Sequence, residues 1–209
     1  NKFVTSVETS FKVGENVTTT YTHDANGYID KITSPLGIQT DYDYDILGRL
    51  AKVTDPLGNE TVYAYDDADR LTNITANTAN GTKNVQINYD QFNNVTSIED
   101  PAGNMMNYSY DECGNLQIIE DPLYNATTLE HDAEGNLISV TDARGNISRA
   151  TYDPLGRTSS ITDPLNNTTT LQYDDLGRLY RITDPKSNVT ELGWDDLNRL
   201  TQIKDPQNN

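Results

Sequence analysis

Residues 171–188 read LQYDDLGRLYRITDPKSN, and variants of this stretch fill almost the whole chain. Each copy has an aromatic residue followed by Asp, then a turn, a Leu, an Ile and usually Thr-Asp-Pro. Successive copies start 21 residues apart, except for one interval of 24. A fixed period of this length is typical of repeat architectures, in which each unit buries its apolar face against its neighbours. The nine copies start at His23, Tyr44, Tyr65, Tyr89, Tyr110, His131, Tyr152, Tyr173 and Trp194.

The repeats predict the domain organisation. Residues 1–22 resemble a degenerate partial repeat, and residues 23–209 form nine tandem repeats of which the last is truncated. Neither end resembles the polar cap that a solenoid needs at its termini. We therefore expect a section of a longer array, with any export signal outside it.

Composition limits the partners of the chain. Its 209 residues are 34% hydrophobic and carry a formal net charge of −17. Such values favour disorder, but apolar residues that keep one position in every repeat predict a folded chain. An excess of 32 carboxylates over 15 basic residues disfavours nucleic acid and anionic membranes. No apolar run is long enough to cross a bilayer, so we predict no nucleic-acid binding and no membrane insertion.

Two turns separate two strands in each copy. The Asp after the aromatic residue starts the first turn, and three positions later comes a residue type that accepts a positive φ. A type I turn closed by a left-handed residue is a common hairpin connection. The second turn, DPLGN at residues 55–59, combines Pro with a later Gly or Asn. The left-handed positions of the first turn are Gly27, Gly48, Asp69, Asn93, Gly114, Gly135, Gly156, Gly177 and Asn198.

Both turns are hairpin turns, and no helical period appears between them. The sequence therefore predicts an all-β fold, a repetitive antiparallel β-hairpin ribbon with about 21 residues per repeat. A ribbon of so many strands is too long to stay flat, because strands twist. We expect it to coil into a spiral, a solenoid or the wall of a hollow shell.

Apolar residues occupy two positions between the turns. One holds Ile or Val in every copy, from Ile32 to Ile203, and the other holds Leu, Ile or Val in every copy except at Thr158. The two positions are three residues apart, which places them on opposite faces of an ideal strand. Either both faces are partly covered or a bulge lies between the positions. We expect Ile161, at the first position, to lie in a buried column.

Residues 44–59 (YDILGRLAKVTDPLGN) recur almost unchanged from residues 152 and 173, and they resemble the tyrosine-aspartate (YD) repeats of the Rhs family. The resemblance covers residues 15–209. It implies a β-hairpin ribbon that spirals into a large hollow shell, commonly around a C-terminal toxin or peptide. Nine copies would supply only part of such a wall. The self-cleaving terminal segment of bacterial shells is not found, so the resemblance carries over no catalytic residue.

Few residues point to catalysis or metal binding, and we predict no catalytic, cofactor or metal residue. His23 and His131 take the ring position of the repeat, and Cys113, the only cysteine, lies in a turn. The Asp after each ring is predicted to cap its turn, with an Arg four positions later as partner; a Ca²⁺ row is the alternative, although the spacing lacks the D-x-D-x-D-G form. These aspartates are Asp24, Asp45, Asp66, Asp90, Asp111, Asp132, Asp153, Asp174 and Asp195, and the arginines are Arg49, Arg70, Arg157, Arg178 and Arg199.

Acceptor sequences for N-glycosylation, Asn-x-Ser/Thr, are frequent. Five follow the second turn directly, so glycans there would decorate one edge at regular intervals. The alternative is chance, because Asn accepts left-handed turns and Thr favours strands. The acceptor sequences begin at Asn16, Asn59, Asn73, Asn80, Asn94, Asn107, Asn125, Asn146, Asn166, Asn167 and Asn188.

These features predict a non-enzymatic structural segment of a secreted or cell-surface Rhs/YD-repeat protein. The segment would form part of a β shell or scaffold, which by family resemblance encloses a C-terminal toxin or other cargo. Predicted partners are further repeats of the same chain or identical chains, the cargo and surface glycans. The alternative is a glycosylated extracellular filament or adhesin of stacked repeats, binding glycans through exposed Tyr.

Overall fold

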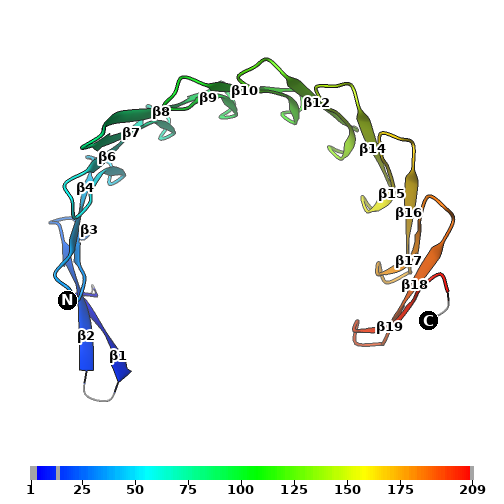
Figure 1. The fold of residues 1–209 in the computed structure, drawn as a ribbon, viewed down its shortest axis with the longest axis horizontal. Coiled ribbons are helices and arrows are strands. Elements are labelled where there is room, and N and C mark those ends of the chain that lie inside the picture. Colours follow the sequence, from blue (N-terminus) through cyan, green and yellow to red (C-terminus); the bar gives the residue numbers. More distant parts are fainter. Residues whose placement is uncertain (1–3, 13–14, 208–209) are drawn as a thin grey trace. The chain divides into compact units, whose positions relative to one another are not determined.

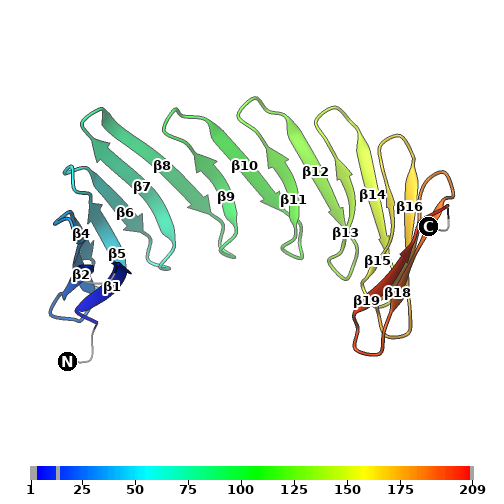
Figure 2. The ribbon, with the colours of Figure 1, turned by 60° about the horizontal axis from the view of Figure 1, so that its bottom comes forward.

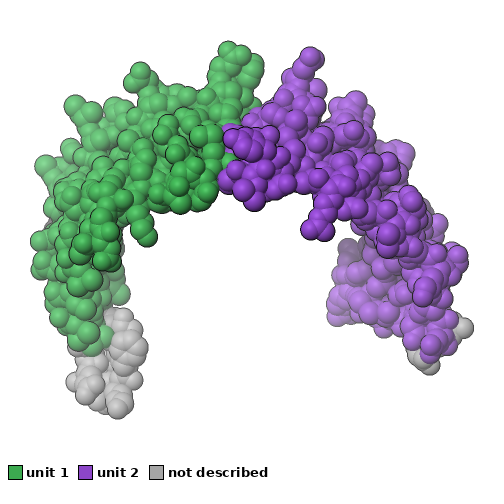
Figure 3. Space-filling view, turned by 45° about the horizontal axis from the view of Figure 1, so that its top comes forward, with its two compact units in different colours: residues 1–105 green, residues 106–209 purple. Residues whose placement is uncertain are grey.

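The computed structural model describes residues 4–12 and 15–207, and every regular element within them is a β-strand. The chain forms two compact units, residues 1–105 and 106–209 (Figure 3). Within each unit the strands pair antiparallel in chain order, in a single layer with turns along both edges (Figures 1 and 2). The predicted all-β fold of antiparallel hairpins is confirmed.

The first nine strands are β1 (Ser6–Lys12), β2 (Glu15–His23), β3 (Ile29–Thr33), β4 (Gln39–Tyr44), β5 (Leu50–Thr54), β6 (Glu60–Tyr65), β7 (Leu71–Thr78), β8 (Gly81–Tyr89) and β9 (Val95–Glu99). The remaining strands are β10 (Met105–Tyr110), β11 (Leu116–Glu120), β12 (Ala126–His131), β13 (Leu137–Thr141), β14 (Ile147–Tyr152), β15 (Thr158–Thr162), β16 (Thr168–Tyr173), β17 (Leu179–Thr183), β18 (Val189–Trp194) and β19 (Leu200–Lys204).

The turn after the ring residue has the predicted form. Between β16 and β17, the Gly177 amide donates to the Asp174 carbonyl at 2.9 Å, and the Asp174 amide donates to the Arg178 carbonyl at 2.9 Å. Atom Oδ1 of Asp174 accepts the amides of Leu176 and Arg178 at 3.0 and 2.9 Å. All nine predicted left-handed positions have positive φ, from 61° at Asn198 to 93° at Gly27. The turn prediction is confirmed.

The second turn repeats this hydrogen-bond pattern. Between β17 and β18, the Asp184 amide donates to the Asn188 carbonyl, and Oδ1 of Asp184 accepts the amides of Lys186 and Asn188 at 2.8 Å each. The left-handed residue is not always the expected Gly or Asn, because Ser187 has a φ of 66° and Tyr124 one of 64°. The fixed turn geometry therefore overrides the preference of these two side chains.

A bulge decides between the two alternatives for the apolar columns. Leu171 pairs with Ile182 and Tyr173 pairs with Leu179, so Tyr180 is the extra residue of β17. Because Leu171 and Tyr173 are two residues apart, they share one face of the sheet. The bulge therefore brings Leu179 and Ile182 onto that same face.

Strands of successive repeats pair over a shorter distance than strands of one hairpin. Strands β15 and β16 pair at Ser160↔Thr170, Ile161↔Thr169 and Thr162↔Thr168. Strands β13 and β14 likewise pair over three residues, and Leu137 lies beyond the last pair. Beyond these three pairs the two strands separate. We call this separation the splay, and a ring residue such as Tyr152 or Tyr173 lies beside it.

The interval of 24 residues is explained by one longer hairpin. Strands β7 and β8 have eight and nine residues, and they pair as far as Thr78↔Gly81. Residues 79 and 80 form the tip of this hairpin in place of an Asp-Pro turn.

No hydrophobic side chain is fully buried in the described part of the chain, and its two buried residues are Ser97 and Ser139. The expectation that Ile161 lies in a buried column is wrong, since Ile161 is 51% exposed. The physical reason is that a single layer has no second layer to cover its faces. Hydrogen bonds and partial packing along the ribbon must therefore hold the repeats together.

Candidate functional site

An Asp that starts a turn is held by the residue four positions later, as Asp132 and Asp153 show. Atom Nε of Arg157 donates to Oδ2 of Asp153 at 2.7 Å, and Nδ2 of Asn136 donates to Oδ2 of Asp132 at 3.0 Å. These side-chain hydrogen bonds are the main reason that the pKa of both carboxyls lies below its usual value. The predicted turn-capping role and the Asp–Arg pairing are thus confirmed.

The acidic residues do not gather into a metal centre. Each turn carboxylate accepts hydrogen bonds from its own turn, with Asp163 receiving the amides of Leu165 and Asn167 and the side-chain amide of Asn167. Within residues 4–12 and 15–207, no group of three or more His, Cys, Asp or Glu side chains could hold an ion. No helix in the same residues could span a membrane.

The Tyr or Trp ring of several repeats lies where the strands of successive repeats separate, and it bonds to the preceding repeat. The Tyr173 hydroxyl donates to the Thr158 carbonyl at 2.9 Å, and Nε1 of Trp194 donates to the Leu179 carbonyl at 2.8 Å. This carbonyl lies beyond the paired part of the strands, so the ring supplies the partner that the neighbouring strand no longer offers. The same bond joins Tyr44 to Ile29, Tyr65 to Leu50, Tyr89 to Leu71 and Tyr152 to Leu137, at 2.8 to 3.0 Å.

At several junctions a flat side chain of the preceding repeat covers the ring. The guanidinium carbon of Arg157 lies 4.5 Å from the centre of the Tyr173 ring, within the range of a cation–π interaction. In the first unit, Arg49 lies over Tyr65 at 4.5 Å. The corresponding pairs are Arg70 over Tyr89 at 4.8 Å, Arg178 over Trp194 at 6.0 Å, and Tyr28 stacked on Tyr44 with ring centres 4.9 Å apart.

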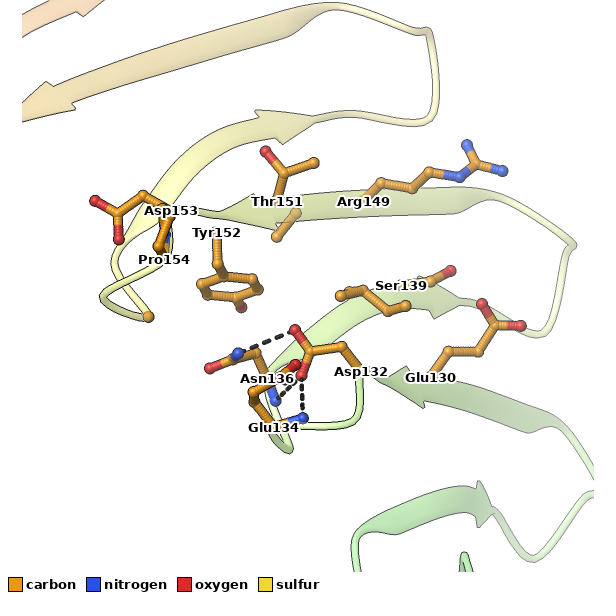
Figure 4. A pocket seen from close by; sticks show the side chains of 13 residues that line it. Glu130, Asp132, Glu134, Asn136, Ser139, Arg149, Thr151, Tyr152, Asp153 and Pro154 are labelled. Carbon is orange, nitrogen blue, oxygen red and sulfur yellow. Dashed lines mark hydrogen bonds between the residues drawn. The ribbon is translucent and has the colours of Figure 1, made fainter.

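The junction before Tyr152 differs, because Asn136 stands where Arg157 stands one repeat later. Asn136 keeps the bonds to its own Asp132 but is too short to reach over the ring. A hollow of about 780 Å³ remains between the 132–136 turn and the 153–156 turn. Figure 4 shows the Tyr152 ring facing this hollow from one side and Asp132 with Asn136 from the other. Its size lies within the range of small-molecule sites.

The residues considered for chemistry are not brought together. His23 and His131 end β2 and β12 at the ring position, as predicted, and Cys113 is an exposed free thiol in the turn between β10 and β11. Among the described residues, these two histidines and this cysteine thus stay in separate repeats.

The glycosylation acceptors fall into three structural groups. In most, including Asn59 and Asn107, the amide Nδ2 already donates to a carboxylate, whereas Asn80 is exposed at the tip of the β7–β8 hairpin and Asn166 is exposed at a positive φ. Asn73 accepts the hydroxyl of Thr75, and the Asn16 side chain lies outside the described residues. Asn94, Asn125, Asn146, Asn167 and Asn188 bond to their turn carboxylates as Asn59 does.

Sequence reasoning missed the bonds from Tyr and Trp rings to the preceding repeat, and it missed the side chains that cover these rings. A signal for the cover exists, because the residue five positions after the ring is Tyr28, Arg49 or Arg70 in the first three copies and Asn94, Asn115 or Asn136 in the next three. A change from a flat side chain to a short one at a fixed position marks the junctions that differ.

The chain is similar to known repeat families. A family model described as Teneurin YD-shell matches residues 2–169, and one described as RHS Repeat matches residues 152–187 and 173–209. No curated protein sequence matches the chain significantly.

Several solved structures have a similar fold. The crystal structure of TcdB2-TccC3-Cdc42 has a TM-score of 0.66 and 17% identity over 91% of this chain and 13% of that chain. TcdB2-TccC3 without its hypervariable C-terminal region has a TM-score of 0.66 and 16% identity over 95% of this chain and 13% of that chain. The Photorhabdus luminescens Tc holotoxin pore has a TM-score of 0.64 and 17% identity over 91% of this chain and 12% of that chain. At these identities the likeness shows the fold alone, and this chain spans about one-eighth of the matched chains.

Proposed function

The chain belongs to the Teneurin YD-shell family, and we propose on that premise that it is a non-enzymatic wall segment of a secreted or cell-surface Rhs/YD-repeat protein. Membership in this family confirms the resemblance that the repeat motif indicated. The functional unit of the proposal is the set of nine tandem repeats that starts at residue 23.

The proposal rests on one observation: successive repeats are joined by ring-to-backbone hydrogen bonds at several junctions, and the described residues include no buried hydrophobic core. The ring of one repeat bonds to a backbone carbonyl of the preceding repeat, as Tyr173 does to Thr158. Such a junction needs only nearest neighbours, so copies can be added without rebuilding an interior. A thin layer that extends in this way is suited to enclosing space, whereas a catalytic site needs several groups that converge.

Exposed apolar side chains along both edges of the ribbon favour a wall in which successive coils of the ribbon contact each other edge to edge. Leu47 and Leu176 at first turns are 65% and 72% exposed, and Leu57 and Leu165 at second turns are 87% and 80% exposed. The two kinds of turn lie on opposite edges (Figure 2). Rows of apolar tips on both edges would be covered where ribbons lie edge to edge, which favours further repeats of the same chain or identical chains as partners.

The enclosed material in this proposal is a C-terminal toxin or other cargo. Electron cryomicroscopy of the complete polypeptide tests it directly. A closed hollow particle with density inside is the expected result. A fibre with helical symmetry would overturn the shell and favour the filament or adhesin alternative, in which exposed Tyr side chains bind glycans.

We also propose that the chain carries N-linked glycans, first at Asn80. This side chain is exposed at a hairpin tip, and only its backbone amide makes a hydrogen bond, to Thr78. By contrast, glycosylation of Asn59 would crowd the bond between its Nδ2 and Asp55. Peptide mass spectrometry after expression in a glycosylating cell should find Asn80 modified to a higher fraction than Asn59. Equal occupancy at both, or none at Asn80, would contradict this order.

A further inference from the structure

At four junctions the side chain in front of the ring is an arginine of the chain itself. The guanidinium of the preceding repeat lies over the ring face, and Nη1 of Arg49, Arg70 and Arg178 donates to the carbonyl of the Asp that starts the next turn. Arg70 donates to the Asp90 carbonyl at 2.8 Å, and Arg178 donates to the Asp195 carbonyl at 2.9 Å. A ring face and one turn carbonyl thus form a receptor for guanidinium that the chain fills with its own arginines.

The same receptor groups are present at Tyr152. Its ring faces the hollow of about 780 Å³, and the Asp153 carbonyl accepts the Gly156 amide at 2.9 Å. A carbonyl has a second lone pair, and the equivalent Asp90 carbonyl accepts both the Asn93 amide and Arg70. Among the described residues, no guanidinium lies over the Tyr152 ring.

Charge around the hollow favours a cation. Glu130, Asp132 and Glu134 line it against a single arginine, Arg149. In Figure 4 the Arg149 guanidinium points away from the Tyr152 ring. A flat aromatic group is the other cover that the chain uses, at Tyr28 over Tyr44, but it would gain nothing from these carboxylates.

We propose that the hollow in front of Tyr152 binds the guanidinium of an arginine side chain that a separate basic segment presents. The guanidinium lies over the Tyr152 ring, as Arg157 lies over Tyr173, and donates to the Asp153 carbonyl, as Arg178 donates to the Asp195 carbonyl. This site is additional to the proposed wall function, since it needs one junction and no closed shell. A single side chain held by one ring and one or two hydrogen bonds binds in the millimolar range.

Fluorine NMR of the chain labelled with fluorotyrosine tests the site. The probe is N-acetyl-arginine amide, and the Tyr152 signal is assigned with Tyr152→Phe. Saturable movement of this signal is expected with the arginine probe. The neutral isostere N-acetyl-citrulline amide should cause at most one-tenth of that movement at the same concentration. No saturable movement, or equal movement with citrulline, would overturn the proposal.

Three variants locate the binding. Asn136→Arg fills the hollow with the chain's own guanidinium and should abolish the response of Tyr152, whereas the same substitution one repeat earlier, Asn115→Arg, should leave it unchanged. Arg157→Asn should create a second hollow, so that the Tyr173 signal also responds to arginine. Persistence of the Tyr152 response in Asn136→Arg would show that the probe binds elsewhere and would overturn the assignment.

Discussion

Replacing Tyr173 by Phe removes one hydroxyl from a junction between repeats and leaves the ring in place. In the structure this hydroxyl donates to the Thr158 carbonyl at 2.9 Å, across the splay between β15 and β16. The ring is partly buried and lies under Arg157. The substitution therefore isolates the bond that we infer to clamp one repeat to the next.

The magnitude follows from the balance of protein and water hydrogen bonds. A neutral intramolecular hydrogen bond contributes about 0.5–1.5 kcal/mol net, and a carbonyl left without its partner adds to the loss. Because the site is only partly buried, water can reach the Thr158 carbonyl, and we expect a loss of about 1 kcal/mol in the free energy of unfolding. With a urea dependence of about 2 kcal/mol per M, the midpoint falls by about 0.5 M.

Trp194, the only tryptophan, reports on this transition by its fluorescence because it occupies the ring position of the next repeat. Tyr180→Phe is the matched control. Its hydroxyl bonds only to the exposed side chain of Gln172 at 3.3 Å, so its removal should cost less than about 0.3 kcal/mol. Equal midpoint shifts in the two variants, or no shift for Tyr173→Phe, would refute the clamp.

Four further outcomes are expected. Gly156→Val should destabilise the chain by about 1–3 kcal/mol, because φ is 75° there, while Gly156→Asn should cost much less in the same thermal melt. Ile161→Asp should cost about 1 kcal/mol rather than several, since the side chain is 51% exposed; a larger loss by urea unfolding would show that the face is covered in solution. A double-mutant cycle of Arg157→Gln with Tyr173→Leu should give a coupling of about 0.5–1 kcal/mol, and no coupling would deny the cation–π contact. Hydrogen bonds lower the pKa of turn aspartates such as Asp153 and Asp163 from 3.8. The stability that these carboxylates contribute is therefore complete above that value and is lost as pH falls through the lower folded-state values. Urea midpoints should drop below about pH 4 and not at neutral pH.

The fold could be predicted from the sequence because its turns are local. Asp at the start of a turn and a residue with positive φ three positions later suffice to close a hairpin, and all nine such positions were predicted correctly. The side-chain identity matters less than the turn itself, as Tyr124 and Ser187 show by adopting the same φ. Local chemistry repeated at a fixed spacing therefore predicts the ribbon.

The relation between repeats could not be predicted in the same way. The bulge at Tyr180 decides on which face Leu179 lies, and it arises from the register that the turn imposes on β16 and β17. The bond from Tyr173 to Thr158 joins residues 15 positions apart and exists only because the strands splay after three pairs. The buried column was predicted wrongly at Ile161 because periodicity reveals which residues share a face and not whether a second layer covers that face.

The residue five positions after the ring has two separable tasks. Holding its own turn needs only a donor near the Asp carboxylate, and Asn136 does this at 3.0 Å much as Arg157 does at 2.7 Å. Covering the next ring needs reach, which Arg157 has and Asn136 lacks. Because the first task alone sets the turn, exchanging Arg for Asn opens a hollow without altering the hairpin. A ribbon of such repeats can therefore leave a ring face uncovered where Asn replaces Arg at this position, as Asn136 does before Tyr152.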